Sequence, residues 1–222
     1  MLGKLESVTF YPQSKQIGDF LGAFKEAALS SSVQNTLSEF HLQALWSWNP
    51  DYSSFLPFTQ LVGLDIYFTC YDGCPSRVDD NILINLSRAM PKSNSLKLGG
   101  NPCRQFTICV TAKGLVALAH HCPNLHMLRV HFQATSLSTL PESPGITPDA
   151  ESASLCMDRT LTDLVVGEIP VLEELALMVT QNLLHIFPRI EDVHSTDDEG
   201  WEKVQDAITN LKRTVDRSTS SK

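Results

Sequence analysis

The sequence lacks the features that mark membrane-spanning, secreted and nucleic-acid-binding proteins. No apolar run approaches the roughly 18 residues that a membrane-spanning helix needs, and the amino terminus has neither the apolar core nor the cleavage site of a secretory signal. Basic residues are few, since 17 Lys and Arg stand against 25 Asp and Glu, a formal net charge of −8, whereas a phosphate-backbone binder carries a clustered basic surface. We therefore expect a protein of the cytoplasm or the nucleus that binds neither membranes nor nucleic acid.

Catalytic motifs are also missing. The chain has no G-x-S-x-G elbow, no G-x-x-x-x-G-K-[ST] loop, no H-E-x-x-H pair and no G-x-G-x-x-G turn. Six cysteines without a secretory signal are expected to be free thiols. Four of them (Cys70, Cys74, Cys103 and Cys109) lie in loops that stacking would place side by side, but neither spacing is the C-x2-C pair typical of zinc. We predict no enzyme, no cofactor and no metal, with a metal-binding module on these cysteines as a less favoured alternative.

The chain does contain an internal repeat. Residues 78–91 align without a gap on residues 110–123, and leucines fall on leucines with the prolines coinciding. Within each copy the apolar positions recur at i, i+3 and i+7, which predicts one buried helical face. Each copy also begins with a short side-chain oxygen suited to a helix N-cap, Asp79 in the first and Thr111 in the second. Helices are predicted over residues 20–29, 79–90, 111–122 and 172–187, and from about residue 198 to residue 211.

A short pattern, L-x-x-L-x-L, precedes or follows each predicted helix and predicts a strand. Units of strand, turn and helix cannot bury their own apolar faces, so units of this length stack with their strands in a parallel sheet. We predict an α/β leucine-rich-repeat solenoid, a horseshoe with the parallel sheet on its concave face and the helices on its convex face. The first positions of the seven copies are Leu5, Leu37, Leu61, Ser93, Leu125, Leu161 and Ile190.

The predicted domain spans residues 1–211 and holds about seven units. Residues 131–159 are rich in Ser, Thr, Pro and acidic residues with little periodicity, and we predict a flexible insertion there. The last predicted helix covers one end of the stack, and residues 212–222 are predicted to form a disordered tail.

Residues 58–132 resemble the leucine-rich repeats of fungal F-box proteins, which belong to the ribonuclease-inhibitor-like group. The resemblance is carried by residues 61–66 (LVGLDI), 110–125 (VTAKGLVALAHHCPNL) and 128–130 (LRV). The second of these is similar to the family's unit V/I-T-x-x-G-L-x-x-L-A-x-x-C-P-x-L. The resemblance implies a substrate-recognition arm that an N-terminal F-box couples to the Skp and cullin parts of a ubiquitin ligase. No F-box is found in this chain, so a Skp-type adaptor is expected as a partner only if an F-box is supplied.

The candidate binding residues are the polar strand residues between the leucines, which point onto the concave face. Lys97 and Arg129 occupy equivalent places in neighbouring strands, with Asp65 beside them. Both signs of charge, together with tyrosine, fit a protein or extended peptide as the partner. A scaffold unrelated to ubiquitin and a truncated, non-functional remnant remain possible interpretations of the same residues. The candidate site is Asp65, Tyr67, Lys97, Arg129, His131 and Asp163.

Overall fold

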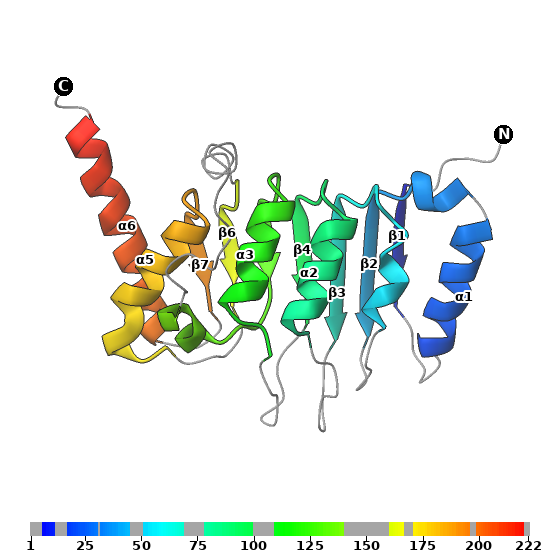
Figure 1. Ribbon diagram of the computed structural model, residues 1–222, viewed down its shortest axis with the longest axis horizontal. Coiled ribbons are helices and arrows are strands. Elements are labelled where there is room, and N and C mark those ends of the chain that lie inside the picture. Colours follow the sequence, from blue (N-terminus) through cyan, green and yellow to red (C-terminus); the bar gives the residue numbers. More distant parts are fainter. Residues whose placement is uncertain are drawn as a thin grey trace.

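The computed structural model describes residues 6–11, 17–30, 32–44, 51–68, 78–99, 109–139, 160–166, 171–195 and 199–219. A parallel sheet of seven strands, in the order β1 to β7, runs through the molecule (Figure 1). Each strand therefore pairs with the next strand along the chain. The strands are β1 (Ser7–Phe10), β2 (Glu39–Ala44), β3 (Gly63–Phe68), β4 (Ser95–Leu98), β5 (Met127–Arg129), β6 (Asp163–Val165) and β7 (Asp192–His194).

The register of the sheet is the one that the sequence repeat predicts. Leu64 of β3 pairs with Leu96 of β4, and Leu96 pairs with Leu128 of β5. All three are at most 1% exposed, so the leucines form one buried row across the sheet. The predicted parallel sheet and its alignment are confirmed.

Helices cover one face of this sheet (Figure 1). Helix α2 packs against α3, and α5 packs against α6. No helix in the described residues is both long and apolar enough to cross a bilayer. The α-helices are α1 (Ile17–Ser30), α2 (Asp80–Ala89), α3 (Ala112–His121), α5 (Ala176–Ile186) and α6 (Glu199–Thr219), and the 3-10 helices are η1 (Ser32–Asn35), η2 (Tyr52–Phe55), η3 (Ala134–Thr139) and η5 (Glu173–Leu175).

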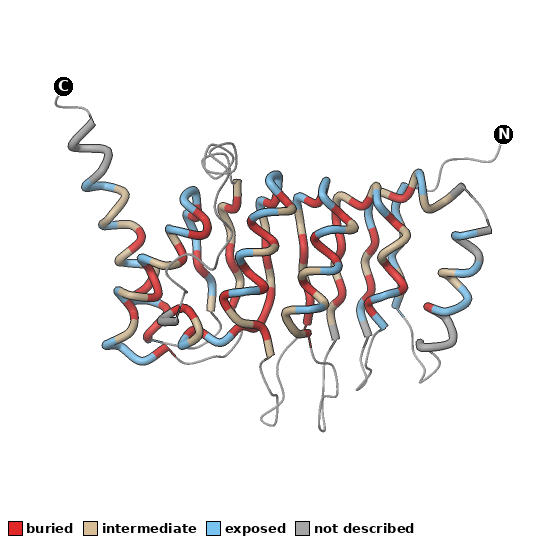
Figure 2. Tube along the Cα trace, in the orientation of Figure 1, coloured by how far each residue is buried: buried red, intermediate tan, exposed pale blue. Residues whose placement is uncertain are grey.

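The opposite face of the sheet is uncovered in the described part of the chain. In β4 the burial alternates: Leu96 and Leu98 are buried in the core, whereas Ser95 and Lys97 are partly exposed. Figure 2 shows the buried positions along the strands and on the helices. Parallel sheets are usually covered on both faces. We call this polar, accessible face of the sheet the open face. Because it is uncovered by the described chain, it is the candidate binding surface.

The helices of the two aligned repeats begin and end as predicted. The side chain of Asp79 accepts a hydrogen bond from Ile82 N at 2.8 Å, and the Thr111 hydroxyl accepts one from Lys113 N at 3.2 Å. Both residues are N-caps, which satisfy backbone N–H groups left unpaired at a helix start. Met90 and Cys122, which the alignment superposes, are both buried.

Helix α6 covers the outer edge of β7. The Gln205 side chain accepts a hydrogen bond from Val193 N at 2.7 Å and donates one to Glu191 O at 2.9 Å, so it pairs with the edge strand as a further strand would. Trp201, at the start of the helix, is 1% exposed. These contacts confirm that the last helix covers this end of the sheet.

The predicted disordered tail is wrong for residues 212–219. Helix α6 continues past Leu211 to Thr219. No Gly or Pro follows Leu211, so the two residues that most often stop a helix are missing there. Residues 220–222 lie outside the described residues.

The predicted flexible insertion at 131–159 is wrong for its first part. Phe132 forms a parallel bridge with Val110 and is completely buried, as is Leu137 in η3. Asn182 of α5 donates a hydrogen bond to Leu137 O at 3.0 Å. A short 3-10 helix thus packs where the repeat would place an α-helix, and residues 140–159 lie outside the described residues.

Candidate functional site

The open face carries two rows of side chains that run across all seven strands. The period of two along each strand sends these residues away from the helices. Because each strand pairs in register with the next, members of a row are neighbours across the sheet. The first row is Ser7, Glu39, Gly63, Ser95, Met127, Asp163 and Asp192, and the second row is Thr9, His41, Asp65, Lys97, Arg129, Val165 and His194.

Asp65 lies between two groups that can carry positive charge. Its Oδ2 is 3.7 Å from Lys97 Nζ and 3.8 Å from His41 Nδ1. His41 also approaches Glu39, with 3.7 Å between Nε2 and Oε2. The structure therefore brings Asp65 and Lys97 together as predicted, and it adds His41, which is not among the predicted site residues.

Arg129 is the cation of this face that lacks a counter-ion within the described residues. It pairs in register with Lys97, but no carboxylate of the described chain forms an ion pair with its guanidinium. Its Nε is buried and has no hydrogen-bond partner in the described residues. A buried guanidinium N–H without a partner is costly to the fold. Arg129 as a whole is only partly buried and has no ion pair among the described residues, so its charge is available to an incoming anion.

A hollow of about 410 Å³ lies beside Arg129 and extends over β1 to β3. Tyr11 and Tyr67 contribute aromatic rings to its lining, and Tyr11 is 67% exposed. Tyr67 is among the predicted site residues and Tyr11 is not, although each directly follows its L-x-x-L-x-L pattern. The hollow is lined by Thr9, Tyr11, His41, Leu42, Gln43, Asp65, Tyr67 and Arg129.

His131, which the sequence places beside the basic pair, offers a partner little surface. It is 8% exposed, and its ring lies against Gly99. A Cβ added to Gly99 would lie 3.2 Å from His131 Cδ2, and Gly99 has a φ of +111°, a conformation that favours glycine. A side chain at Gly99 would therefore crowd the histidine ring.

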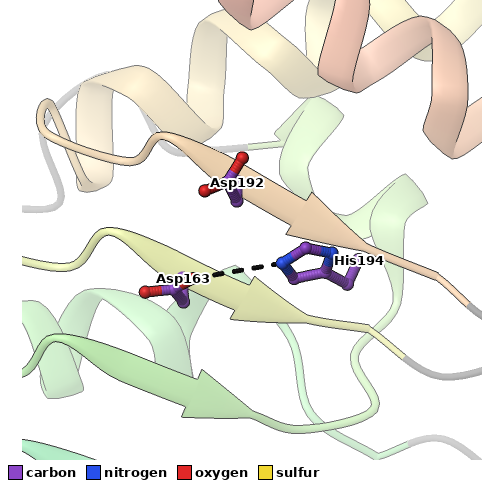
Figure 3. A group of neighbouring side chains, drawn as sticks. All are labelled: Asp163, Asp192 and His194. Carbon is purple, nitrogen blue, oxygen red and sulfur yellow. Dashed lines mark ion pairs between the residues drawn. The ribbon is translucent and has the colours of Figure 1, made fainter.

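The far end of the open face is acidic. Asp163 of β6 pairs in register with Asp192 of β7, and the His194 Nε2 is 3.9 Å from Asp163 Oδ1 (Figure 3). The Thr162 hydroxyl donates a hydrogen bond to Asp163 Oδ2 at 2.8 Å. The predicted residue Asp163 therefore belongs to a cluster with Asp192 and His194, neither of which is among the predicted site residues.

Among the described residues, Asp163, Asp192 and His194 have side-chain donor atoms that are close enough to share a metal ion. These atoms lie within 4.8 Å of one another. Two carboxylates and an imidazole suit ions such as Zn²⁺ or Mn²⁺. Exposed acidic groups are common without an ion, however. We therefore treat it as the acidic end of the open face.

The alternative metal module falls almost entirely outside the described residues. Cys70, Cys74 and Cys103 lie outside them, and Cys109 is half-buried. Burial raises the pKa of the Cys122 thiol to about 12, so this group stays protonated and is a poor ligand. Its Sγ donates to backbone oxygens inside the core instead, at 3.5 Å from Met90 O and 3.6 Å from Ser87 O.

His120 and His121, at the end of α3, contact each other. The rings of His120 and His121 meet edge to face with centroids 4.7 Å apart. Burial, followed by the charges of His120 and Arg88, lowers the pKa of His121. Both histidines lie in the last turn of the helix, as the sequence predicts.

We compared the chain with protein families and with curated proteins. No family model matches the chain, and no curated protein matches it. Functional inference therefore rests on the open face itself.

Proposed function

We propose that the chain is a leucine-rich-repeat solenoid that recognises another protein, or an extended peptide of that protein, on its open, concave face. The regular L-x-x-L-x-L units, the strand order β1 to β7 and the helices on the opposite face support this architecture. In such a solenoid the curvature gathers side chains from many repeats onto one surface. No catalytic role is proposed for any of them.

The observation that carries the proposal is Arg129 beside the tyrosine-lined hollow. Arginine and tyrosine dominate the energetics of protein interfaces, because they combine large contact areas with directional hydrogen bonding. Arg129 has a buried Nε without a partner in the described chain, and Tyr11 is largely exposed. A partner with a carboxylate and an apolar side chain would pair with the charge of Arg129 and cover the Tyr11 ring.

By the resemblance to fungal F-box proteins, we further propose that this surface is the substrate-receptor-like arm of an F-box type ubiquitin ligase acting in the cytoplasm or nucleus. A Skp-type adaptor would join only through an F-box. The reading frame ahead of the codon for Met1 tests this part: an in-frame F-box supports the ligase arm, whereas its absence favours a scaffold unrelated to ubiquitin.

A non-functional remnant and a metal module are the competing interpretations, and each has a direct test. A remnant would aggregate or unfold without cooperativity, so a cooperative monomer in size-exclusion chromatography and thermal unfolding counts against it. A metal module on Cys70, Cys74, Cys103 and Cys109 requires bound zinc, and elemental analysis of purified protein showing a stoichiometry near zero removes it.

The recognition function is tested by selecting a random displayed peptide library on the immobilised protein. The selected peptides are then measured against two variants with the same change of charge. Arg129→Glu alters the open face, and Lys113→Glu alters an exposed position on α3. We expect the peptides to bind wild type and Lys113→Glu equally, and to bind Arg129→Glu at least about tenfold more weakly. A library without binders, or binders that tolerate Arg129→Glu, would overturn the proposal.

A further inference from the structure

The charges on the open face alternate in sign along the order of the strands. Glu39 and Asp65 lie on β2 and β3, and the two cations follow on β4 and β5. Acidic residues return on β6 and β7. We call these groups the first acidic band (Glu39 and Asp65), the basic band (Lys97 and Arg129) and the second acidic band (Asp163 and Asp192).

The bands are not neutralised equally within the protein. Lys97 pairs with Asp65, which leaves Arg129 as the main recognition charge of the basic band. In the second acidic band, the two carboxylates occupy paired positions of adjacent strands, an arrangement that is destabilising for like charges. The described chain places only the imidazole of His194 within ion-pair distance of Asp163, and none of its cations pairs with Asp192. Positive charge from outside would relieve this repulsion.

The strand spacing fixes the distance between bands. Adjacent strands lie about 4.8 Å apart. Asp65 on β3 and Asp192 on β7 are each two strands away from Arg129 on β5, so each acidic band has a carboxylate about 10 Å from Arg129 across the sheet. A segment in polyproline II conformation rises about 3.1 Å per residue with three residues per turn, so every third side chain projects to the same side at a spacing of about 9 Å. A β-strand would project them at about 7 Å or 13 Å instead. The long, flexible side chains of the partner and of Arg129 accommodate the difference of about 1 Å between the spacing on the sheet and the spacing on the segment.

We infer that the open face binds a segment in polyproline II conformation that crosses the strands and carries a basic, an acidic and a basic side chain at every third position. The inference rests on the proposed function and names the class of partner. The acidic side chain pairs with Arg129 beside the tyrosine hollow, and the basic side chains pair with the two acidic bands. The four carboxylates and two cations of the bands also attract a segment with net positive charge and disfavour nucleic acid.

The test uses synthetic, fluorescently labelled peptides with two prolines between successive charged residues. One peptide has the order Lys, Glu, Lys, a second has the same composition in the order Glu, Lys, Lys, and a third has three Lys. Affinities for the full chain are measured by fluorescence anisotropy at low ionic strength, where surface charges are least screened. We expect the first peptide to bind at least about tenfold more tightly than the second.

Charge reversal in the protein supplies the matched control. Arg129→Glu should weaken the Lys, Glu, Lys peptide at least about tenfold and should strengthen the peptide with three Lys, whereas Lys113→Glu should leave both affinities unchanged. Arg129→Gln should weaken the first peptide without strengthening the third, and circular dichroism verifies that each variant is folded. Addition of EDTA should change nothing, because no ion bridges the contact.

Equal affinities of the Lys, Glu, Lys and the Glu, Lys, Lys peptides would overturn the inference. It would also be overturned if none of the three peptides bound, or if EDTA abolished binding. The library selection separates this failure from that of the proposed function. If selected peptides depend on Arg129 but show no basic, acidic, basic order, recognition on the open face stands and the inferred partner class falls. If they do not depend on Arg129, both proposals fall.

Discussion

The carboxylate of Asp80 on α2 accepts a hydrogen bond from the backbone N–H of Gly114 on α3, with 3.1 Å between Oδ1 and N. The same carboxylate accepts from Thr111 N at 2.8 Å and from the Thr111 hydroxyl at 2.6 Å. One residue of the first repeat therefore satisfies the start of the next helix. This contact gives a physical reason for the T-x-x-G spacing of residues 111–114: threonine binds the carboxylate, and glycine lets it approach.

Gly114→Ala should lower the free energy of unfolding by about 1–3 kcal/mol, because there is no room for a Cβ. An added Cβ would lie 2.6 Å from Asp80 Oδ1 and 3.1 Å from Leu83 Cδ1, and the carboxylate is held in place by its hydrogen bonds. Urea unfolding monitored by circular dichroism measures the change. The control is Gly22→Ala in α1, where no atom lies within 4 Å of the added Cβ and where the higher helix propensity of alanine should raise stability by up to about 1 kcal/mol. Equal stability of Gly114→Ala and wild type would contradict the contact.

Leu118→Ala should destabilise the protein by about 2–5 kcal/mol through the cavity that it leaves. Leu118 is completely buried between the helix layer and the sheet, at the position that the alignment superposes on Leu86. Val116, on the same helix, is 36% exposed, so Val116→Ala should change stability by no more than about 0.5 kcal/mol. Thermal and urea unfolding compare the two variants, and similar effects at both positions would show that the helix faces the core differently.

Much of the fold was predictable because the repeat encodes it locally. The pattern L-x-x-L-x-L fixes which strand residues face the core, and a parallel sheet of equal units then fixes which residues are neighbours, such as Lys97 and Arg129. Contacts between repeats were not predictable in the same way. That Asp80 would hold Thr111 depends on the distance between two helices, which no local spacing reveals.

The sequence predicted which residues of the candidate site are neighbours, but it did not predict how exposed each of them is. Exposure depends on what surrounds a side chain: His131 is 8% exposed, and its ring lies against Gly99, where any larger residue would crowd it. Residues 131–139 show no helical period, yet their two large apolar side chains, Phe132 and Leu137, are completely buried and anchor the segment. The composition of this segment predicted flexibility, because composition does not show which apolar residues reach the core.

Cys122 should be unreactive in the folded protein and should make stability fall at alkaline pH. Burial raises its pKa from 9.0 to about 12. The folded state therefore keeps the proton more tightly than the unfolded state, so the contribution is fully present below pH 9 and is lost as pH rises toward 12. Iodoacetamide labelling at about pH 8, followed by peptide mass mapping, should modify Cys122 only after denaturant is added. The Cys122→Ala variant should lose less stability than wild type between pH 9 and pH 12, and parallel curves would contradict the raised pKa.

Arg129→Met should leave the free energy of unfolding unchanged or raise it by up to about 1–3 kcal/mol, although the same change removes partner binding. The reason is that the guanidinium has a buried Nε without a partner and no ion pair among the described residues, while the apolar stem of methionine can fill the same space. Lys97→Met is the control, because it breaks the pair with Asp65 and should cost at most about 1 kcal/mol. Urea unfolding gives the stabilities, and anisotropy with the Lys, Glu, Lys peptide gives the binding. A clear loss of stability in Arg129→Met would show that Arg129 supports the fold, and the case for a side chain held ready for a partner would then fail.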